Sequence, residues 1–156
     1  MKKIMFVCHG NICRSPMAEF VMKKMVADRG LENQFVICSS ATSTEEIGND
    51  IHPSTRRALD KNGVPYSRRE AVQLDRRDYE KYDLFIGMDS ANVRNMHRIF
   101  GSDPDGKIKK LLDYTNRPGD VADPWYTGDF SATWRDVNEG CEGLISIIKR
   151  NEGPAY

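Results

Sequence analysis

The sequence has 156 residues, of which 39% are hydrophobic and 29% charged, and its 23 basic side chains balance its 23 acidic ones. This length fits a single domain of roughly 100–150 residues, and the balanced charge argues against a nucleic-acid partner or an acidic membrane surface. The longest apolar run near the start, residues 4–8, is too short for a signal peptide or a membrane span. We therefore expect one cytoplasmic domain over residues 1–156.

Strand-like and helix-like patterns alternate along the chain. Apolar runs predict strands over residues 2–8, 35–38 and 83–88, and a weaker one over 107–112. Helical spacing predicts helices from Pro16 to about residue 29 with Ser15 as N-cap, over 54–62, over 90–100 and around 134–148, with mostly loop over 113–130. This order predicts an α/β fold, a four-stranded parallel sheet with helices on both faces. Ligands of such sheets bind at the carboxyl ends of the strands, here just after Cys8, Ser40 and Met88.

A loop with the features of an anion site joins the first strand to the first helix. Its sequence is Cys8-His9-Gly10-Asn11-Ile12-Cys13-Arg14-Ser15. The amides of a loop that turns into a helix N-terminus converge on one point, where the helix dipole also favours negative charge. Gly10 lets the backbone close around the anion, and the Arg14 fork binds two phosphate oxygens at once. The same positive field favours the thiolate of Cys8, and Ser15 is placed to donate a hydrogen bond to it.

The run from Val7 to Pro16 resembles the signature loop of the low-molecular-weight protein tyrosine phosphatases. The resemblance continues at residues 39–43 after the second strand, 88–92 after the third and 123–126 in the long loop. It therefore covers nearly the whole chain. The fold that it implies, a four-stranded parallel sheet flanked by helices with a phosphate-binding loop after the first strand, agrees with the alternating pattern.

The resemblance implies a cysteine-dependent phosphatase of phosphotyrosine proteins and small aryl phosphates. Cys8 would attack phosphorus, Arg14 and the loop residues 9–13 would hold the phosphate, and Asp123 would protonate the leaving phenolate. Asp123 would then act as base for water while Ser15 stabilises the departing thiolate. Amides and a guanidinium supply the positive field, so no metal or cofactor is expected. We expect a monomer that releases inorganic phosphate.

Several residues around this loop bear on the substrate. Trp125 and Tyr126 would form a wall against a phenyl ring, or else pack against the sheet edge. In the family that the chain resembles, relatives that prefer phosphoarginine have threonine at the position of Ile12. The apolar side chain of Ile12 therefore favours an aryl phosphate in this protein. His9 and Glu45 stand where relatives have apolar or aromatic residues, so this pocket is expected to be more polar. Residues 68–71 lack the histidine that supports the loop in some relatives, which leaves that support open.

The remaining cysteines and histidines have modest expected roles. In the family that the chain resembles, the cysteines at the positions of Cys8 and Cys13 form a reversible disulfide; the alternative is that Cys13 is only a small buried loop residue. Cys38 and Cys141 are expected to pack in the core. His52 and His97, which have no partner at metal-ligand spacing, are expected on the surface.

Two other functions compete with this interpretation. A thioredoxin-coupled arsenate reductase of the same fold needs two further cysteines beyond the third strand, but residues 83–140 contain none. A phosphotyrosine-binding or phosphocarrier domain would hold phosphate without hydrolysing it. Such a domain has little use for a general acid, so Asp123 in its matching position argues against it.

Overall fold

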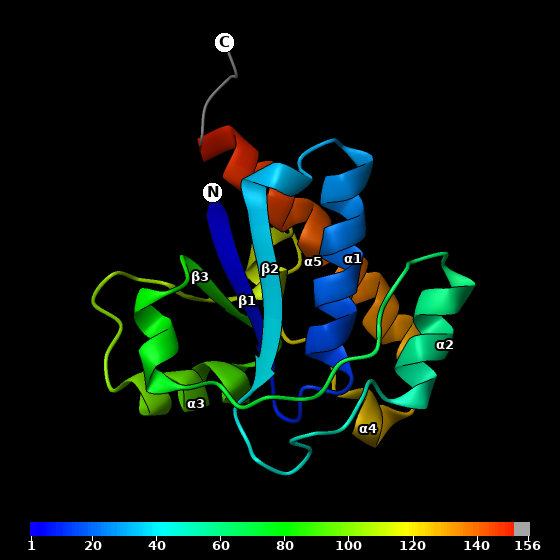
Figure 1. Cartoon of the computed structure of the whole chain (residues 1–156), viewed down its shortest axis with the longest axis horizontal. Coiled ribbons are helices and arrows are strands. Elements are labelled where there is room, and N and C mark those ends of the chain that lie inside the picture. The colour runs from blue at the N-terminus through cyan, green and yellow to red at the C-terminus, as the bar shows by residue number, and fades with distance from the viewer. Residues whose placement is uncertain (152–156) are drawn as a thin grey trace.

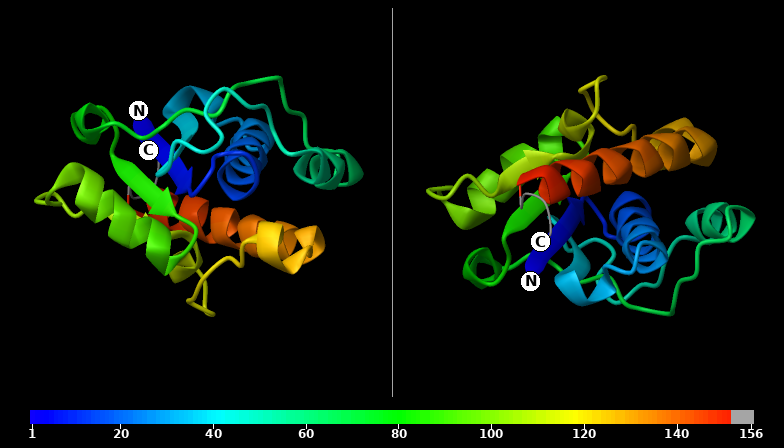
Figure 2. Two further views of the ribbon diagram at one scale, coloured as in Figure 1. Left: turned by 90° about the horizontal axis from the view of Figure 1, so that it is seen from below. Right: turned by 90° about the horizontal axis from the view of Figure 1, so that it is seen from above.

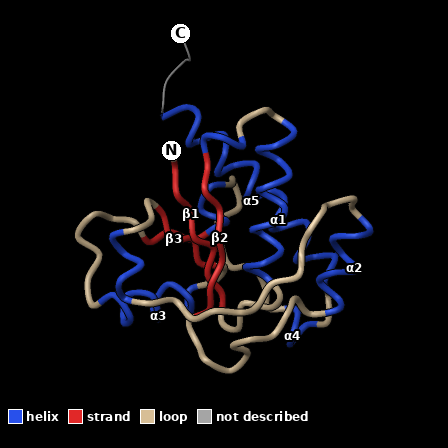
Figure 3. Tube along the Cα trace, viewed as in Figure 1, coloured by secondary structure: helices blue, strands red, loops and turns tan. Residues whose placement is uncertain are grey.

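The centre of the protein is a parallel sheet of four strands. The structure, a computed structural model, describes residues 1–151, so the last five residues of the domain expected over 1–156 lie outside it. The strands are β1 (Lys2–Cys8), β2 (Phe35–Ala41), β3 (Leu84–Gly87) and β4 (Ile108–Lys110), and their order across the sheet is β2-β1-β3-β4. Figure 3 shows the strands in red at the centre of the molecule, among the blue helices. The predicted fold class is confirmed.

Helices cover both faces of the sheet. They are α1 (Arg14–Asp28), α2 (Pro53–Lys61), α3 (Ser90–Phe100), α4 (Pro124–Thr127) and α5 (Phe130–Asn151). Figure 1 and the two views of Figure 2 show α1 and α5 together on one face and α3 on the other. Helix α2 packs against α1 and α5, at the outer side of that layer. None of the helices within residues 1–151 is long and apolar enough to cross a membrane.

The side chains of β1 alternate between two apolar cores. Ile4 and Phe6 point into the larger core with α1 and α5, whereas Met5 and Val7 point into a smaller one with α3. All four are at most 5% exposed, as expected for a strand in the middle of a sheet with both faces covered.

The strand register brings three strand ends to one place. Cys8 pairs with Ala41 of β2, and Val7 pairs with Gly87 of β3. The first, second and third strands therefore end side by side, with β1 between the other two. Residues that follow these strands are far apart in sequence but meet at one edge of the sheet, as the predicted fold requires.

Two segments after the third helix differ from expectation. The fourth strand ends at Lys110, not at Leu112, because Leu111 and Leu112 turn inward in a short 3₁₀ helix, η3 (Leu111–Tyr114), and are buried. The segment expected to be mostly loop contains α4, which is N-capped by Asp123 and ends at Gly128 with a left-handed φ of 71°. A helix of one turn has no apolar period, so the sequence pattern did not predict it.

Helix α5 packs very closely on η3, and this contact yields a stability prediction. A Cβ at Gly143 would lie 2.0 Å from the carbonyl oxygen of Tyr114. We expect Gly143→Ala to lower the free energy of unfolding by about 1–3 kcal/mol or more, although alanine alone would favour the helix by about 1 kcal/mol. Urea denaturation measures the change. Ser146→Ala, at an exposed position of the same helix, is the matched control and should not lower the stability; equal stability of Gly143→Ala and the parent would contradict the prediction.

Candidate active site

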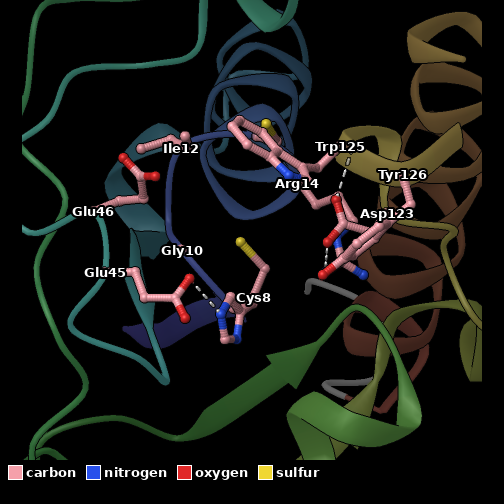
Figure 4. A pocket seen from close by; sticks show the side chains of 11 residues that line it. Cys8, Gly10, Ile12, Arg14, Glu45, Glu46, Asp123, Trp125 and Tyr126 are labelled. Atoms are coloured by element: carbon pink, nitrogen blue, oxygen red, sulfur yellow. Dashed lines mark hydrogen bonds and ion pairs between the residues drawn. The ribbon is translucent and has the colours of Figure 1, made fainter. Parts of the chain in front are cut away.

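A narrow pocket of about 120 Å³ opens at the carboxyl edge of the sheet. Its floor is the loop between β1 and α1, with Cys8, Ile12, Cys13 and Arg14 buried. Glu45 and Glu46 line one side and Asp123, Trp125 and Tyr126 the opposite side (Figure 4). All the residues expected to bind substrate line this pocket except Asn11, which is buried.

The Cys8 sulfur accepts hydrogen bonds from the loop that surrounds it. The amides of Asn11 and Ser15 donate to Sγ at 3.3 and 3.4 Å, and the Ser15 hydroxyl lies 3.0 Å from it. The sulfur therefore lies where the amides of the loop converge, at the start of α1. The predicted contact between Ser15 and Cys8 is confirmed.

The predicted capping role of Ser15 is wrong. Helix α1 begins at Arg14, with Cys13 as N-cap residue and no side-chain cap, so Ser15 lies in the first turn. The Ser-Pro pair has the composition of a helix start, but here the loop already coils around the sulfur before Ser15. The hydroxyl consequently points at Cys8 and Asn11, not at the free amides of the helix.

Arg14 is held in the pocket by acidic partners from two other segments. Nη1 donates to Asp89 at 2.6 Å and to the Val121 carbonyl at 3.0 Å, and Nη2 lies 3.4 Å from Asp123. Burial lowers the pKa of Arg14, but negative charge on Cys8 and the bond to Asp89 outweigh it, so this pKa lies above its ordinary value. Arg14 is therefore a fixed cation beside the Cys8 sulfur.

Asp123 and two aromatic side chains form the opposite wall. Oδ1 of Asp123 accepts from the Trp125 amide at 3.0 Å, which caps α4. Trp125 and Tyr126 are 62% and 85% exposed, so they stand at the mouth of the pocket. The alternative, that these rings pack against the sheet edge, is not what the structure shows.

Asn11 combines an unusual backbone conformation with a side chain whose polar groups are all hydrogen-bonded. Within residues 1–151 it is the only non-glycine residue with positive φ, 60°, a conformation that asparagine tolerates better than most residues. Its side-chain amide donates to Ser15 at 2.8 Å and Ser39 at 2.9 Å, and its Oδ1 accepts from the Val72 amide at 3.2 Å. The strained residue is thus fixed by every polar group of its side chain.

Arg69 supplies the loop support that the sequence left open. Its Nη2 donates to the Asn11 carbonyl, and its backbone amide donates to Asp50 at 3.2 Å. Burial lowers the pKa of Arg69, while Glu19 and Cys8 raise it in part, which places a second guanidinium within electrostatic reach of the sulfur. Beneath Asn11, Ser39 donates to Glu19 at 2.6 Å.

The acidic residues on one side of the pocket contact residues of the loop between β1 and α1. Nε2 of His9 lies 3.0 Å from Oε2 of Glu45, with the two side chains 48% and 67% exposed. Glu46 approaches Gly10 so closely that a Cβ there would lie 3.2 Å from its Cγ. The pocket is more polar on this side, as His9 and Glu45 predicted.

His52 corrects a further expectation, because it is half-buried. Its Nδ1 accepts from the Ser54 amide at 3.0 Å and so caps α2, and its ring stacks on Phe130. His97 is exposed and Cys141 is buried, both as expected.

Several residues of the site were not predicted as such: Asp89, Arg69, Glu19 and Ser39. Asp89 had a usable signal, since it follows the third strand at the sheet edge where the site was expected. Arg69 had none, because only the fold brings it near residues 8–15, whereas Glu19 lies one turn along α1 from Ser15.

Comparison with known proteins agrees with this geometry. A family model described as "Low molecular weight phosphotyrosine protein phosphatase" matches residues 3–153. The low molecular weight protein-tyrosine-phosphatase YfkJ of Bacillus subtilis is 35% identical over 154 residues, which is 97% of this chain and 99% of that protein. PtpA of Staphylococcus haemolyticus, which has the same descriptive name, is 34% identical over 97% of this chain and 96% of its own.

Solved structures are similar along the whole length. The crystal structure of YfkJ has a TM-score of 0.93 and covers 99% of this chain and 98% of its own. That of SP-PTP from Streptococcus pyogenes, a low molecular weight protein tyrosine phosphatase, has a TM-score of 0.88 at 42% identity, with 97% and 96% covered. With the signature loop, the sheet and the family match in agreement, this chain belongs to the low molecular weight phosphotyrosine protein phosphatases.

Proposed function

We propose that this enzyme hydrolyses phosphotyrosine in proteins, and small aryl phosphates, through a phosphocysteine intermediate on Cys8. The observation that carries the proposal is the set of donors around the Cys8 sulfur, in one pocket with Arg14 and Asp123. A buried thiolate, an anion cradle and a carboxyl group on the opposite wall are the parts that a two-step phosphoryl transfer needs.

In the first step the Cys8 thiolate attacks phosphorus in line with the leaving oxygen. A phosphorus–sulfur bond forms while the phosphorus–oxygen bond to the phenol breaks. The loop amides and Arg14 bind the three equatorial oxygens, on which negative charge is spread in the transition state. Asp123 gives its proton to the phenolate oxygen, so that a neutral phenol leaves.

In the second step water attacks the same phosphorus atom. Asp123, now a carboxylate, takes a proton from the water, and the phosphorus–sulfur bond breaks to release inorganic phosphate. The Ser15 hydroxyl, 3.0 Å from Sγ, stabilises the thiolate that leaves. One carboxyl group thus serves both steps.

The pocket walls favour an aromatic phosphate. Ile12 gives the floor an apolar surface, and Trp125 and Tyr126 stand where a phenyl ring would enter. His9 and Glu45 at the mouth are then the residues that meet the peptide flanking the phosphotyrosine.

The experiment is phosphate release by the purified chain from three matched peptides, which carry phosphotyrosine, phosphoserine or phosphoarginine. We expect phosphotyrosine to have the highest kcat/KM, and rapid acid quench followed by mass spectrometry to find the phosphate on the peptide containing Cys8. A bound but uncleaved phosphotyrosine peptide would favour a phosphate-binding domain, and preferred cleavage of phosphoarginine would move the substrate to another class.

The support of Asn11 by Arg69 gives a second testable result. Arg69→Met removes a charge-assisted hydrogen bond to the loop, for which about 1.5–3 kcal/mol is typical. We expect a loss of roughly ten- to a hundredfold in kcat/KM, weaker inhibition by inorganic phosphate and, because the same bond holds the folded loop, a melting temperature about a few degrees lower. Arg68→Met, one residue away and exposed, is the matched control. An equal effect of the two substitutions would show that Arg69 does not position the loop.

We further propose that the enzyme acts as a monomer in the cytoplasm, without metal or cofactor. The reversible disulfide between Cys8 and Cys13 also stays a prediction. Both residues are free thiols here, and burial, together with the charge of Cys8, raises the pKa of Cys13 to about 12. Cys13 is therefore a thiol, not a thiolate, at neutral pH.

A further inference from the structure

A second hollow lies beside the candidate active site, between α2 and the first turns of α5. This groove, about 440 Å³ in volume, is lined by Arg57 and Lys61 of α2, Arg135 of α5, and the aromatic side chains of Phe130 and Trp134. Figure 1 shows the two helices that line it, α2 and α5, with α4 nearby. It has no part in the chemistry proposed above.

The groove carries uncompensated positive charge. Its one carboxylate, on Asp129, accepts from the Ala132 amide at 2.9 Å at the start of α5. Within residues 1–151 none of the three cations forms an ion pair, and Arg57 donates only to the Ser54 hydroxyl, at 2.7 Å. Elsewhere at α5, by contrast, Arg117 is bound by both Asp136 and Glu139.

An aromatic row connects the groove to the phosphate pocket. Trp125, in the pocket wall, lies 6.0 Å from the His52 ring between centroids, and His52 stacks on Phe130, in the groove wall, at 5.4 Å. The two outer rings are thus no more than about 11 Å apart. An extended peptide advances about 3.3 Å per residue, so this distance corresponds to at most about three or four residues.

The other side of the pocket has the opposite charge. Glu45 and Glu46 lie across from Trp125 and Tyr126 (Figure 4). A peptide whose phosphotyrosine occupies the pocket therefore meets carboxylates on one side and cations on the other. Such polarity fixes the direction in which a charged peptide lies, because like charges at close distance repel.

We infer that the groove of Arg57, Lys61 and Arg135 is a subsite for acidic residues of the phosphotyrosine substrate. It binds Asp or Glu side chains up to about four positions from the phosphotyrosine, on one side of it only. This inference rests on the proposed tyrosine phosphatase activity. It adds the class of substrate: phosphoproteins with an acidic segment near the modified tyrosine.

The test compares kcat/KM for three phosphotyrosine peptides of equal length. One has neutral flanks, one has glutamate at the third and fourth positions before the phosphotyrosine, and one has it at the same positions after. We expect one acidic peptide to exceed the neutral one by about two- to tenfold, as exposed ion pairs allow, and the excess to shrink at high salt. The other acidic peptide should show no such gain.

The variant that removes the subsite is the triple substitution Arg57→Gln, Lys61→Gln and Arg135→Gln. It should abolish the preference, with unchanged kcat/KM for the neutral peptide and for p-nitrophenyl phosphate. The matched control is Arg94→Gln, Arg98→Gln and Lys109→Gln, which removes three exposed charges from α3 and β4 and should keep the preference.

The outcomes separate the two proposals. Turnover of the neutral peptide with no gain from glutamate at either end would overturn the subsite alone, as would a preference that survives the triple substitution or disappears in the control. Absence of turnover of every phosphopeptide and of p-nitrophenyl phosphate would overturn the proposed activity itself, and the subsite with it.

Discussion

Cys8→Ser is expected to reduce phosphotyrosine hydrolysis by at least about 10³-fold. A serine hydroxyl is not ionised at neutral pH, so the group that attacks phosphorus is lost. The anion cradle is not lost with it. Its donors are the backbone amides of Asn11 and Ser15 and the Arg14 guanidinium, which Asp89 holds in place. We therefore expect phosphate or vanadate to bind with an affinity within a few-fold of the parent.

The measurement pairs steady-state kinetics with calorimetric titration of vanadate. Cys38→Ser is the matched control, since Cys38 is half-buried on β2 and does not line the pocket; it should retain activity. Normal turnover by Cys8→Ser would remove Cys8 from the mechanism. Loss of both turnover and vanadate binding would mean instead that the loop depends on the sulfur for its shape.

The part of the site that is contiguous in sequence could be predicted from it. Residues 8–15 lie between a strand of continuous apolar residues and a helix, and this context fixes where their amides point. The alternation of strands and helices also predicted that residues after β2 and β3 would meet this loop. The acidic rim at Glu45 and the contact of Asp89 with Arg14 are consequences of that order, because β1 lies between β2 and β3.

What holds the loop in place could not be predicted in the same way. Arg69 reaches Asn11 from a segment with no periodic relation to the loop, and Glu19 on α1 accepts from Ser39 of a different strand. Polar contacts of this kind depend on side-chain positions, not on strand order. For Ser15 the sequence led to a wrong expectation. A residue type that is common at helix N-caps was assigned that local role, although its hydroxyl is used by the sulfur beside it.

Because Asp123 also caps the short helix α4, its role as general acid must be tested separately from its structural role. Asp123 does two things in the structure: Oδ1 caps α4 through the Trp125 amide, and Oδ2 faces Arg14 across the pocket. Asparagine caps helices as well as aspartate does, so Asp123→Asn keeps the cap and removes the acid together with its negative charge beside Arg14. Asp123→Ala would lose both, and the difference between these two variants isolates the structural contribution.

Asp123→Asn is expected to lower kcat/KM by roughly 10²–10⁴-fold for a poor leaving group such as the phenol of phosphotyrosine, the usual range for a lost general acid. A good leaving group departs as the anion and needs no proton, so 2,4-dinitrophenyl phosphate should lose much less. kcat/KM is the right quantity because it covers the steps through phosphoryl transfer to Cys8 and leaves out the hydrolysis of phosphocysteine, in which Asp123 acts again. A plot of log kcat/KM against the acidity of the leaving phenol should therefore be steeper for the variant than for the parent. Parallel lines, with equal losses for every phenol, would show that Asp123 only shapes the wall of the pocket.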